Sequence, residues 1–598
     1  MNHKTSYSLR ERASFYFILG LFFLGSSIGV FAQKPLNPIK DNGPKSMIEL
    51  VRADSLVGEN SLSRTQTFLG NVIFIHRGVK LGCEKAIHNQ SSNFIEAYGK
   101  IVINQGDTLT IVGDTLMYDG NLRFAKVYGK QVILRDKKVT LRTTKMHYDL
   151  NRDQAYYPVP GVLNQDSSRL SSKEGYYNTK TKFFRYIGDV EILNPSYTLC
   201  TDSLDYDTYS KQAIFKTFTT IKSKNGDLSA YKGKYNIKTK VSAFQGRAKV
   251  TNSDYSLEGD TLQFDNIKSS GQADGNVVFV SFKDSLVVVG EKGFRFGEKG
   301  LTKIIGNTIS QRVSQKDTLL IASDTLWVFE KQKTKSIDSL KVTMTKTTKD
   351  SVLVAPKNKN PILEKKKARL VPDPTPLATT VASADTSSAG KTPTSKDIEK
   401  IIADGKVEVY KTDFQSLSDS LVYNLKDSLI HFFRKPIIWN QENQLEADTM
   451  IITLKNNRLK LMQLIQNSFV VEVDTIRNYN QIKGRKIDAI FDNKSVLQTI
   501  KVEGNGESKY FALDEKNKII GLNTVQCSSM QFYFKDKKIK SIVFRGKPES
   551  TLIPPKEILN DDMRLERFEW KANKKPSKES IFAKKFGSLI RNTKMMVI

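Results

Sequence analysis

The chain has 598 residues, of which 93 are Lys or Arg and 63 are Asp or Glu, so its formal net charge is +30. This length permits more than one domain and a large buried core. The three cysteines and five histidines have no metal-ligand spacing, so we expect no metal site and no cofactor. A Cys83–Cys200 disulfide is one alternative, and three free cysteines are the favoured one.

The N-terminus has the pattern of an export signal. Lys4, Arg10 and Arg12 precede an uncharged run over residues 13–32, which ends in a small-residue pattern. We therefore predict a signal peptide over 1–32 and a short tether over 33–46, rich in proline. The alternative is that the run is retained as an inner-membrane anchor, because about 20 apolar residues suffice to span a bilayer.

If the chain is exported, the anions that its positive charge can bind are those outside the cytoplasm. A net charge of +30 in a cytosolic protein would first indicate nucleic acid. For an exported protein the available anions are phosphorylated lipids and acidic glycans, so we do not expect a nucleic-acid partner. The alternative is that the lysines cover exposed strand edges and keep the protein soluble.

A short motif, Asp-Ser/Thr followed by Leu or Met, recurs along the chain. In each copy an apolar residue stands three before the Asp and another stands two after it. Five residues separate these two positions, so strict alternation would place them on opposite faces of a strand. The strand must therefore bulge or bend there, and we predict that the acidic residues mark structural corners: Asp114, Asp202, Asp260, Asp324 and Asp448.

Glycines form a second series in register with this motif. Most stand directly before an alternating apolar run, at steps of about 29 to 31 residues, with one doubled step where Thr219 replaces the glycine: Gly70, Gly99, Gly129, Gly161, Gly188, Gly246, Gly275 and Gly306. A repeat of this size is typical of stacked units that cannot bury a core alone. Helical periodicity is absent before residue 554, so we predict an all-β solenoid.

Composition divides the chain into segments. The repeats run from 47 to 330 and resume over 398–553, which predicts two β-domains. Residues 331–397 hold a proline-rich, low-complexity stretch and form a linker or an insertion. Residues 554–598 form a basic tail, for which we favour disorder over an amphipathic helix that lies on a membrane or docks on a partner.

These repeats resemble the OstA-like family of lipopolysaccharide-transport proteins. The resemblance rests on glycine-led runs such as GNVIFI and GKIVIN and on the D-[ST]-L-x-[YF]-[DN] motif, over residues 47–330 and 398–553. It implies a β-jelly-roll of stacked V-shaped strand pairs that is open along its length. It also implies a periplasmic carrier or bridge, which works with the other transport components of the two membranes and associates end to end.

The same resemblance implies that the inward-facing residues after each glycine touch the acyl chains of lipopolysaccharide or a related anionic glycolipid. The candidates are Val72, Phe74, Ile101, Ile103, Val132, Leu134, Val190, Ile192, Val277 and Phe279. The alternative reading of these residues is a closed core, which is the usual role of inward residues in a solenoid.

The sequence pattern also occurs in two other classes of protein, enzymes and exported structural proteins. Enzymes that degrade polysaccharides also use β-solenoids, but the acidic residues here recur at equivalent repeat positions, as structural residues do, so we do not expect an enzyme. An exported structural solenoid or adhesin without lipid transport is the alternative function.

Overall fold

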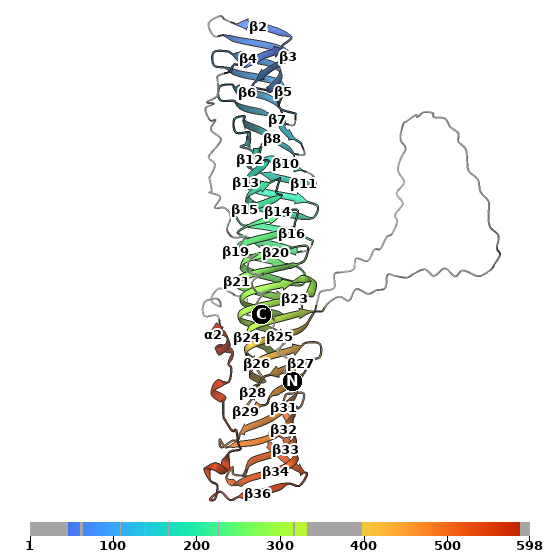
Figure 1. Cartoon of the computed structure of the whole chain (residues 1–598), viewed down its shortest axis with the longest axis vertical. Helices are drawn as coiled ribbons and strands as arrows, with labels where there is room; N and C mark the ends of the chain where they lie inside the picture. The colour runs from blue at the N-terminus through green and yellow to red at the C-terminus, as the bar shows by residue number, and fades with distance from the viewer. Residues whose placement is uncertain are drawn as a thin grey trace, which may run out of the picture. The chain divides into compact units, whose positions relative to one another are not determined.

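The computed structural model describes residues 46–59, 64–107, 109–137, 139–165, 167–224, 226–314, 317–331, 397–536 and 538–585. The predicted signal peptide, nearly all of the tether and the low-complexity segment, and the end of the basic tail lie outside these residues. The described part is almost entirely β-structure, which confirms the predicted all-β solenoid of stacked short strands (Figure 1).

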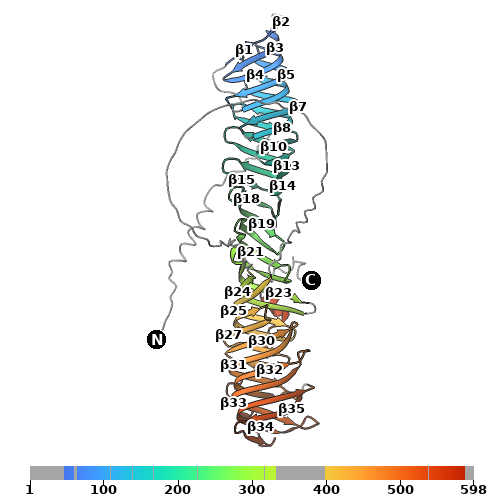
Figure 2. The same cartoon turned by 90° about the vertical axis from the view of Figure 1, so that its right-hand side faces the viewer.

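The chain divides into two compact units, which are described separately. The first contains the described residues up to Asn252 together with Glu258–Ile267, and the second contains Ser253–Leu257 and the described residues from Lys268 onward. Figure 2 shows that the strands within each unit stack in chain order.

The strands up to residue 265 are β1 (Glu49–Arg52), β2 (Ser55–Glu59), β3 (Thr65–His76), β4 (Val79–Asn89), β5 (Phe94–Gln105), β6 (Leu109–Asp119), β7 (Phe124–Asp136), β8 (Val139–Asp149), β9 (Gln154–Tyr157), β10 (Gly161–Gln165), β11 (Ser168–Ser172), β12 (Glu174–Asn178), β13 (Phe183–Asn194), β14 (Tyr197–Asp207), β15 (Gln212–Phe215), β16 (Thr219–Ser223), β17 (Gly226–Ala230), β18 (Lys232–Asn236), β19 (Val241–Thr251) and β20 (Tyr255–Asp265).

The elements from residue 270 onward are β21 (Ser270–Ser281), β22 (Leu286–Phe296), the 3-10 helix η1 (Gly297–Lys299), β23 (Leu301–Ser314), β24 (Asp317–Glu330), β25 (Ile398–Lys411), β26 (Phe414–Asn424), β27 (Leu429–Phe433), β28 (Ile437–Asn440), β29 (Asn443–Glu446), β30 (Thr449–Lys455), β31 (Arg458–Val473), β32 (Tyr479–Phe491), β33 (Leu497–Leu513), β34 (Ile519–Lys535), β35 (Lys538–Arg545), β36 (Glu549–Ile553), η2 (Asn560–Met563), η3 (Ala572–Lys574) and α2 (Lys578–Lys585).

Each long strand bends at its middle and so contributes to two leaves of a folded sheet. Between β5 and β6, Tyr98 pairs with Thr115 and Ile101 pairs with Gly113, so two residues of β5 face one residue of β6. Similar two-against-one interruptions recur in both units. A bulge of this kind re-aims the strand and increases its local twist. The sheet therefore folds over along a line of bulges, and its core lies between the leaves.

The bulges have a common backbone conformation. Six of the eight glycines in the series have a positive φ, and so does the residue after each: Gly70 and Asn71, Gly99 and Lys100, Gly188 and Asp189, Gly246 and Arg247, Gly275 and Asn276, and Gly306 and Asn307. Glycine reaches this left-handed region without the steric cost of a Cβ atom. The glycine series thus reflects a backbone requirement at the bend.

The strands on either side of the low-complexity segment are neighbours in the sheet. β24 and β25 pair from Leu320 with Tyr410 to Glu330 with Ile398. The amide of Lys331 donates to the carbonyl of Asp397 over 2.8 Å. Residues 332–396 therefore connect two strands that are neighbours in the sheet.

The described part of the tail differs from the expectation of a disordered segment. Residues 554–585 follow β36 and pack on the second unit, with Ile581 of α2 buried (Figure 1). This packing is possible because the outer face of that unit carries apolar residues, such as Ile309 and Leu320, that take up the apolar residues of the tail.

A pair of glycine substitutions tests the bend. Gly99 and Gly78 have nearly the same φ, +76° and +78°, but a Cβ at Gly99 would lie 2.4 Å from Oε2 of Glu84, whereas a Cβ at Gly78 meets nothing within 4 Å. We expect Gly78→Ala to lower the free energy of unfolding by about 1 to 2 kcal/mol through backbone strain, and Gly99→Ala to lower it further. Urea unfolding measures both, and equal losses would show that the facing carboxylate does not restrict the bend.

Candidate functional site

The predicted corner residues lie opposite the bends of neighbouring strands. Oδ2 of Asp114 accepts a hydrogen bond from the backbone amide of Lys130 at 2.7 Å. Oδ2 of Asp448 accepts one from the Asn467 side chain at 2.8 Å. A Cβ on Gly405, at the bend of β25, would lie 2.6 Å from Oδ2 of Asp324. The acidic side chains thus fill the space above a neighbouring bend.

The remaining two corner residues have the same setting. Asp260 lies 3.5 Å from Nη1 of Arg247, which is the second residue of a bend. Asp202 is exposed at the matching position of β14. None of the five Asp residues has a positive φ. The left-handed residues of the bends are therefore the glycine pairs, and the predicted corner residues face such bends from neighbouring strands.

The ten candidate lipid-contacting residues all point into the core. Each has 5% or less of its surface exposed: Val72, Phe74, Ile101, Ile103, Val132, Leu134, Val190, Ile192, Val277 and Phe279. In the structure as it stands they are buried between the leaves. Ile192 also lines a cavity of about 310 Å³.

The two leaves of the first unit meet along a line that we call the seam, where the hairpin ends of one leaf face the hairpin ends of the other. Three tyrosines near the ends of β6, β8 and β12 make hydrogen bonds across it. Tyr118 bonds with Nδ1 of His76 at 2.7 Å, and the hydroxyl of Tyr148 donates to Gln105 at 2.5 Å. The seam is thus held by polar contacts from tyrosines that are themselves buried.

The third tyrosine contact includes two charged groups. The hydroxyl of Tyr177 donates to Oδ2 of Asp136 at 2.6 Å, and Nζ of Lys182 forms an ion pair with the same carboxylate. Burial, together with the neighbouring Asp136 carboxylate, raises the pKa of Tyr177 well above its usual value, so this hydroxyl remains a donor at all physiological pH values.

One repeat further along the seam, a cavity of about 310 Å³ lies open to the solvent. Gln165 and Tyr206 line it, at the positions equivalent to Asp136 and Tyr177 of the previous repeat. Its other apolar lining residues are Leu163, Leu170, Tyr186, Ile192, Tyr197 and Ile237, and its polar lining residues are Ser167, Ser168, Asn194, Lys211 and Lys238. The cavity connects the apolar interior with a rim that carries two lysines.

This arrangement can bind an amphiphile. The inner wall consists of aliphatic and tyrosine side chains, which favour hydrocarbon. Burial raises the pKa of Tyr197 to about 12 and that of Tyr186 well above its usual value, so the walls contribute no negative charge. Lys211 and Lys238 lie where an anionic head group would emerge.

The described residues offer little support for a metal site, a disulfide or a membrane-spanning helix. They contain no cluster of His, Cys, Asp or Glu that could hold a metal ion. Cys83, Cys200 and Cys527 are free, so the disulfide alternative is not formed, and burial raises the pKa of the Cys83 thiol to about 11. In the same part of the chain, no helix has the length and apolarity needed to cross a bilayer.

The sequence analysis did not identify the seam tyrosines as a functional group of residues. Their signal was present, because Tyr118, Tyr148, Tyr177, Tyr206 and Tyr235 recur every 29 to 30 residues. Tyr118 and Tyr206 occupy the aromatic position of the repeated motif, which was interpreted only as a buried position.

Removing one seam hydrogen bond tests its contribution. We expect Tyr177→Phe to lower the free energy of unfolding by about 1 to 3 kcal/mol, because the buried Asp136 carboxylate loses a donor. Tyr209→Phe is the matched control, since Tyr209 is 92% exposed. Urea unfolding of both variants compares them, and a Tyr177→Phe value equal to the control would mean that the bond does not hold the seam.

Residues 45–202 and 189–260 match a family model described as OstA-like protein. No curated protein matches the chain in sequence. Among solved structures, one similar chain is LptH of Pseudomonas aeruginosa, described as the LptA-homologous periplasmic component of the lipopolysaccharide transport device. It is 14% identical, with a TM-score of 0.17, and the match covers 18% of this chain and 79% of that chain.

Proposed function

Because this chain belongs to the OstA-like family through residues 45–260, we propose that it is an exported carrier or bridge that binds lipopolysaccharide or a related anionic glycolipid in the periplasm. The observation that carries this proposal is the cavity at the seam, which joins an apolar interior to a lysine-bearing rim.

The cavity supports binding of an acyl chain. Burying each CH₂ group of a chain gains about 0.8 kcal/mol, so even part of one chain gives a useful affinity. The inward residues predicted from the sequence are buried between the leaves, and those of the first unit are the proposed continuation of this binding surface. A longer stretch of chain would reach them only if the seam opened, since they are buried in the closed structure.

The rim supports a negatively charged head group. Lys211 is half-buried and Lys238 is exposed, on the turns that follow β14 and β18. A phosphate or carboxylate held there would be attracted by both lysines, and salt would weaken this attraction because the site faces the solvent. The net charge of +30 favours the same class of ligand.

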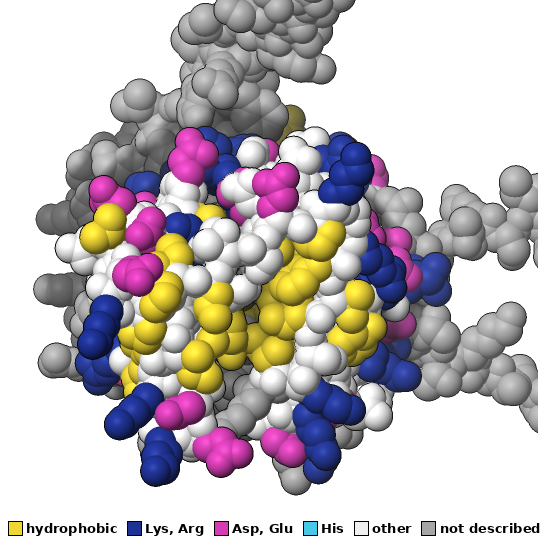
Figure 3. Space-filling view, turned by 90° about the horizontal axis from the view of Figure 1, so that it is seen from below, with side chains coloured by type: hydrophobic (Ala, Val, Ile, Leu, Met, Phe, Trp, Pro, Cys, Tyr) yellow, Lys and Arg dark blue, Asp and Glu magenta, His cyan; other side chains and the backbone are white. Residues whose placement is uncertain are grey.

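Edge strands in each of the two units support a bridge. β2 pairs only with β3, and β36 pairs only with β34, among the described strands. The end strands also expose apolar side chains, such as Val57 and Leu552. Figure 3 views the end of the second unit and shows hydrophobic side chains in the middle of this surface, with charged side chains of both signs around its edge. Such ends can add a strand from another molecule, either a second copy or a transport partner.

A catalytic function is not proposed. The acidic residues that recur through the repeats serve the bends, as Asp114 and Asp448 do. A carrier needs a binding surface and no catalytic group. The seam cavity provides apolar walls and a rim with two lysines.

Site-specific photo-crosslinking tests lipid binding. A photoreactive residue at Ile192 or Leu170 lies in the cavity wall, and we expect it to crosslink to lipopolysaccharide both in cells and with the purified protein. The outward-facing Lys130 is the matched control, and the fully buried Val132 reports on the interior between the leaves.

The pattern of crosslinks separates the models. Crosslinks from Ile192 alone support a local site, and crosslinks that extend to Val132 support a seam that opens along its length. If the cavity positions capture no glycolipid while the protein is folded and exported, the carrier function is wrong and a structural solenoid is the better description.

A charge placed on an end strand tests the bridge. We expect Val57→Lys and Leu552→Lys to reduce end-to-end association, because an inserted charge blocks edge pairing. Native mass spectrometry of the purified chain measures the oligomers, with Ile267→Lys, an exposed position away from both ends, as the control. Unchanged oligomers in the end variants would exclude the ends as the contact.

A further inference from the structure

A row of residues crosses the outer face of the second unit from strand to strand. Its members are direct cross-strand partners in β26, β28, β29, β31, β32 and β33, in this order: Gln415, Trp439, Gln444, Val471, Gln481 and Lys509. On an exposed sheet face such positions usually carry charged residues, but this row has one lysine and is otherwise uncharged. Something must therefore cover it.

The C-terminal segment 563–585, which we call the strap, lies on this face (Figure 1). The side chain of Gln481 binds its backbone twice: Nε2 donates to the carbonyl of Met563 and Oε1 accepts from the amide of Leu565, both at 2.7 Å. The carboxamide carries the same donor and acceptor as a peptide group, so Gln481 pairs with the strap as a strand would.

Gln444 repeats the same contact six residues further along the strap. Its Nε2 donates to the carbonyl of Glu569 and its Oε1 accepts from the amide of Lys571, again at 2.7 Å. Both glutamines are almost fully buried, at 1% and 0% exposed. Each glutamine binds one backbone carbonyl of the strap and the backbone amide two residues later. The two glutamines therefore bind the main chain of the strap in the same way.

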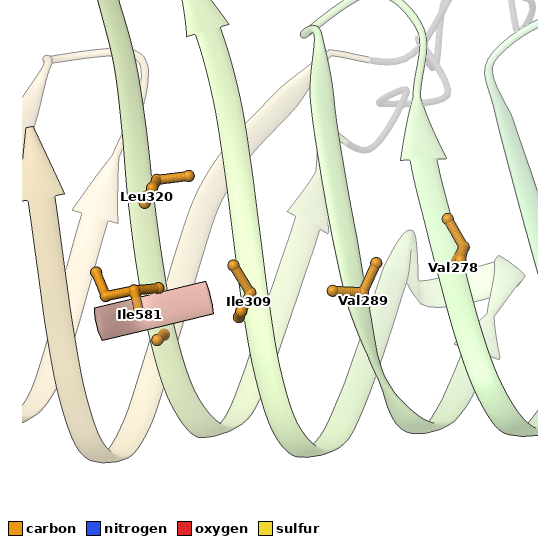
Figure 4. Packing of buried hydrophobic residues seen from close by; sticks show 6 residues of the cluster. Val278, Val289, Ile309, Leu320 and Ile581 are labelled. Atoms are coloured by element: carbon orange, nitrogen blue, oxygen red, sulfur yellow. The ribbon is translucent and has the colours of Figure 1, made fainter. Parts of the chain in front are cut away.

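Side chains anchor the strap between and beyond these contacts. Leu565 packs on Phe469 and Val471, and Nζ of Lys571 lies 2.8 Å from Oε2 of Glu446. Figure 4 shows α2 lying across the strands, with Ile581 beside Leu320 and Ile309. Ile581 is fully buried in a cluster on this outer face.

The strap is nevertheless a minor part of the fold. Only Leu565, Pro576 and Ile581 are buried among residues 554–583, and the residues that lead into the strap, 554–562, are mostly exposed. The core between the leaves is complete without it. A segment with few buried side chains belongs to the low end of local stability, so it can leave its surface without global unfolding.

We propose that this outer face is a peptide-docking surface and that the strap is its reversibly bound, tethered ligand. Gln444 and Gln481 form hydrogen bonds with the main chain of the peptide. Two apolar sites accept the side chains of Leu565 and Ile581. The occupant is the C-terminal segment of this chain, and when it leaves, the face becomes free for the same segment of a second copy. This inference is independent of lipid binding.

The test uses the full chain with a specific protease site placed within residues 556–560. After cleavage we expect the strap to stay bound through size-exclusion chromatography, and to be displaced by excess synthetic peptide of residues 560–585. Fluorescence anisotropy of the labelled peptide then gives its affinity for the cleaved protein. We expect Gln444→Glu with Gln481→Glu to weaken the peptide by at least about tenfold, since each variant loses the Nε2 donor.

Control substitutions in the protein and in the peptide separate an effect on binding from an effect on folding. Gln415→Glu alters a buried glutamine of the same row that bonds to the carbonyl of Lys411 and not to the strap, so it should leave the affinity unchanged. Leu565→Ala and Ile581→Ala in the peptide alone should weaken binding without any effect on the folding of the protein. Immediate loss of the cleaved strap, failure of the peptide to exchange, or equal affinity in all variants would each overturn the proposal.

Discussion

The structure depends on how a long strand bends at its middle without losing its ladder hydrogen bonds. Two left-handed residues on one strand face a single residue on the next, and the pairing resumes beyond them, as in β5 and β6. An acidic side chain such as Asp114 or Asp324 occupies the space above a neighbouring bend. Because the bends align from strand to strand, the sheet of each unit folds over along its bends and encloses an apolar interior.

The same alignment determines where the hairpin ends lie. Folding each strand at its middle brings its ends towards those of the next repeat, which creates the seam. Where the facing residues are Tyr118, Tyr148 and Tyr177 with polar partners, hydrogen bonds hold the seam. Gln165 and Tyr206, at the equivalent positions of the next repeat, line a cavity that is open to the solvent.

Much of the fold could be predicted from the sequence, because the bend leaves a strictly local signal. The glycine series and the break in alternation at Asp114 both follow from backbone geometry within a few residues. The seam could not be predicted in this way, since Tyr177 and Asp136 are 41 residues apart and only the stacking brings them together. The strap was missed for a similar reason: Gln444, Val471 and Gln481 become one row only when three strands pair.

The insertion between β24 and β25 has a consequence for how this protein tolerates change in length. The two ends of the insertion are joined by a hydrogen bond between Lys331 and Asp397, so the ladder continues as though nothing stood between them. The pairing of β24 with β25 and this hydrogen bond involve none of the residues 332–396, so a change in the number of residues there leaves both contacts in place.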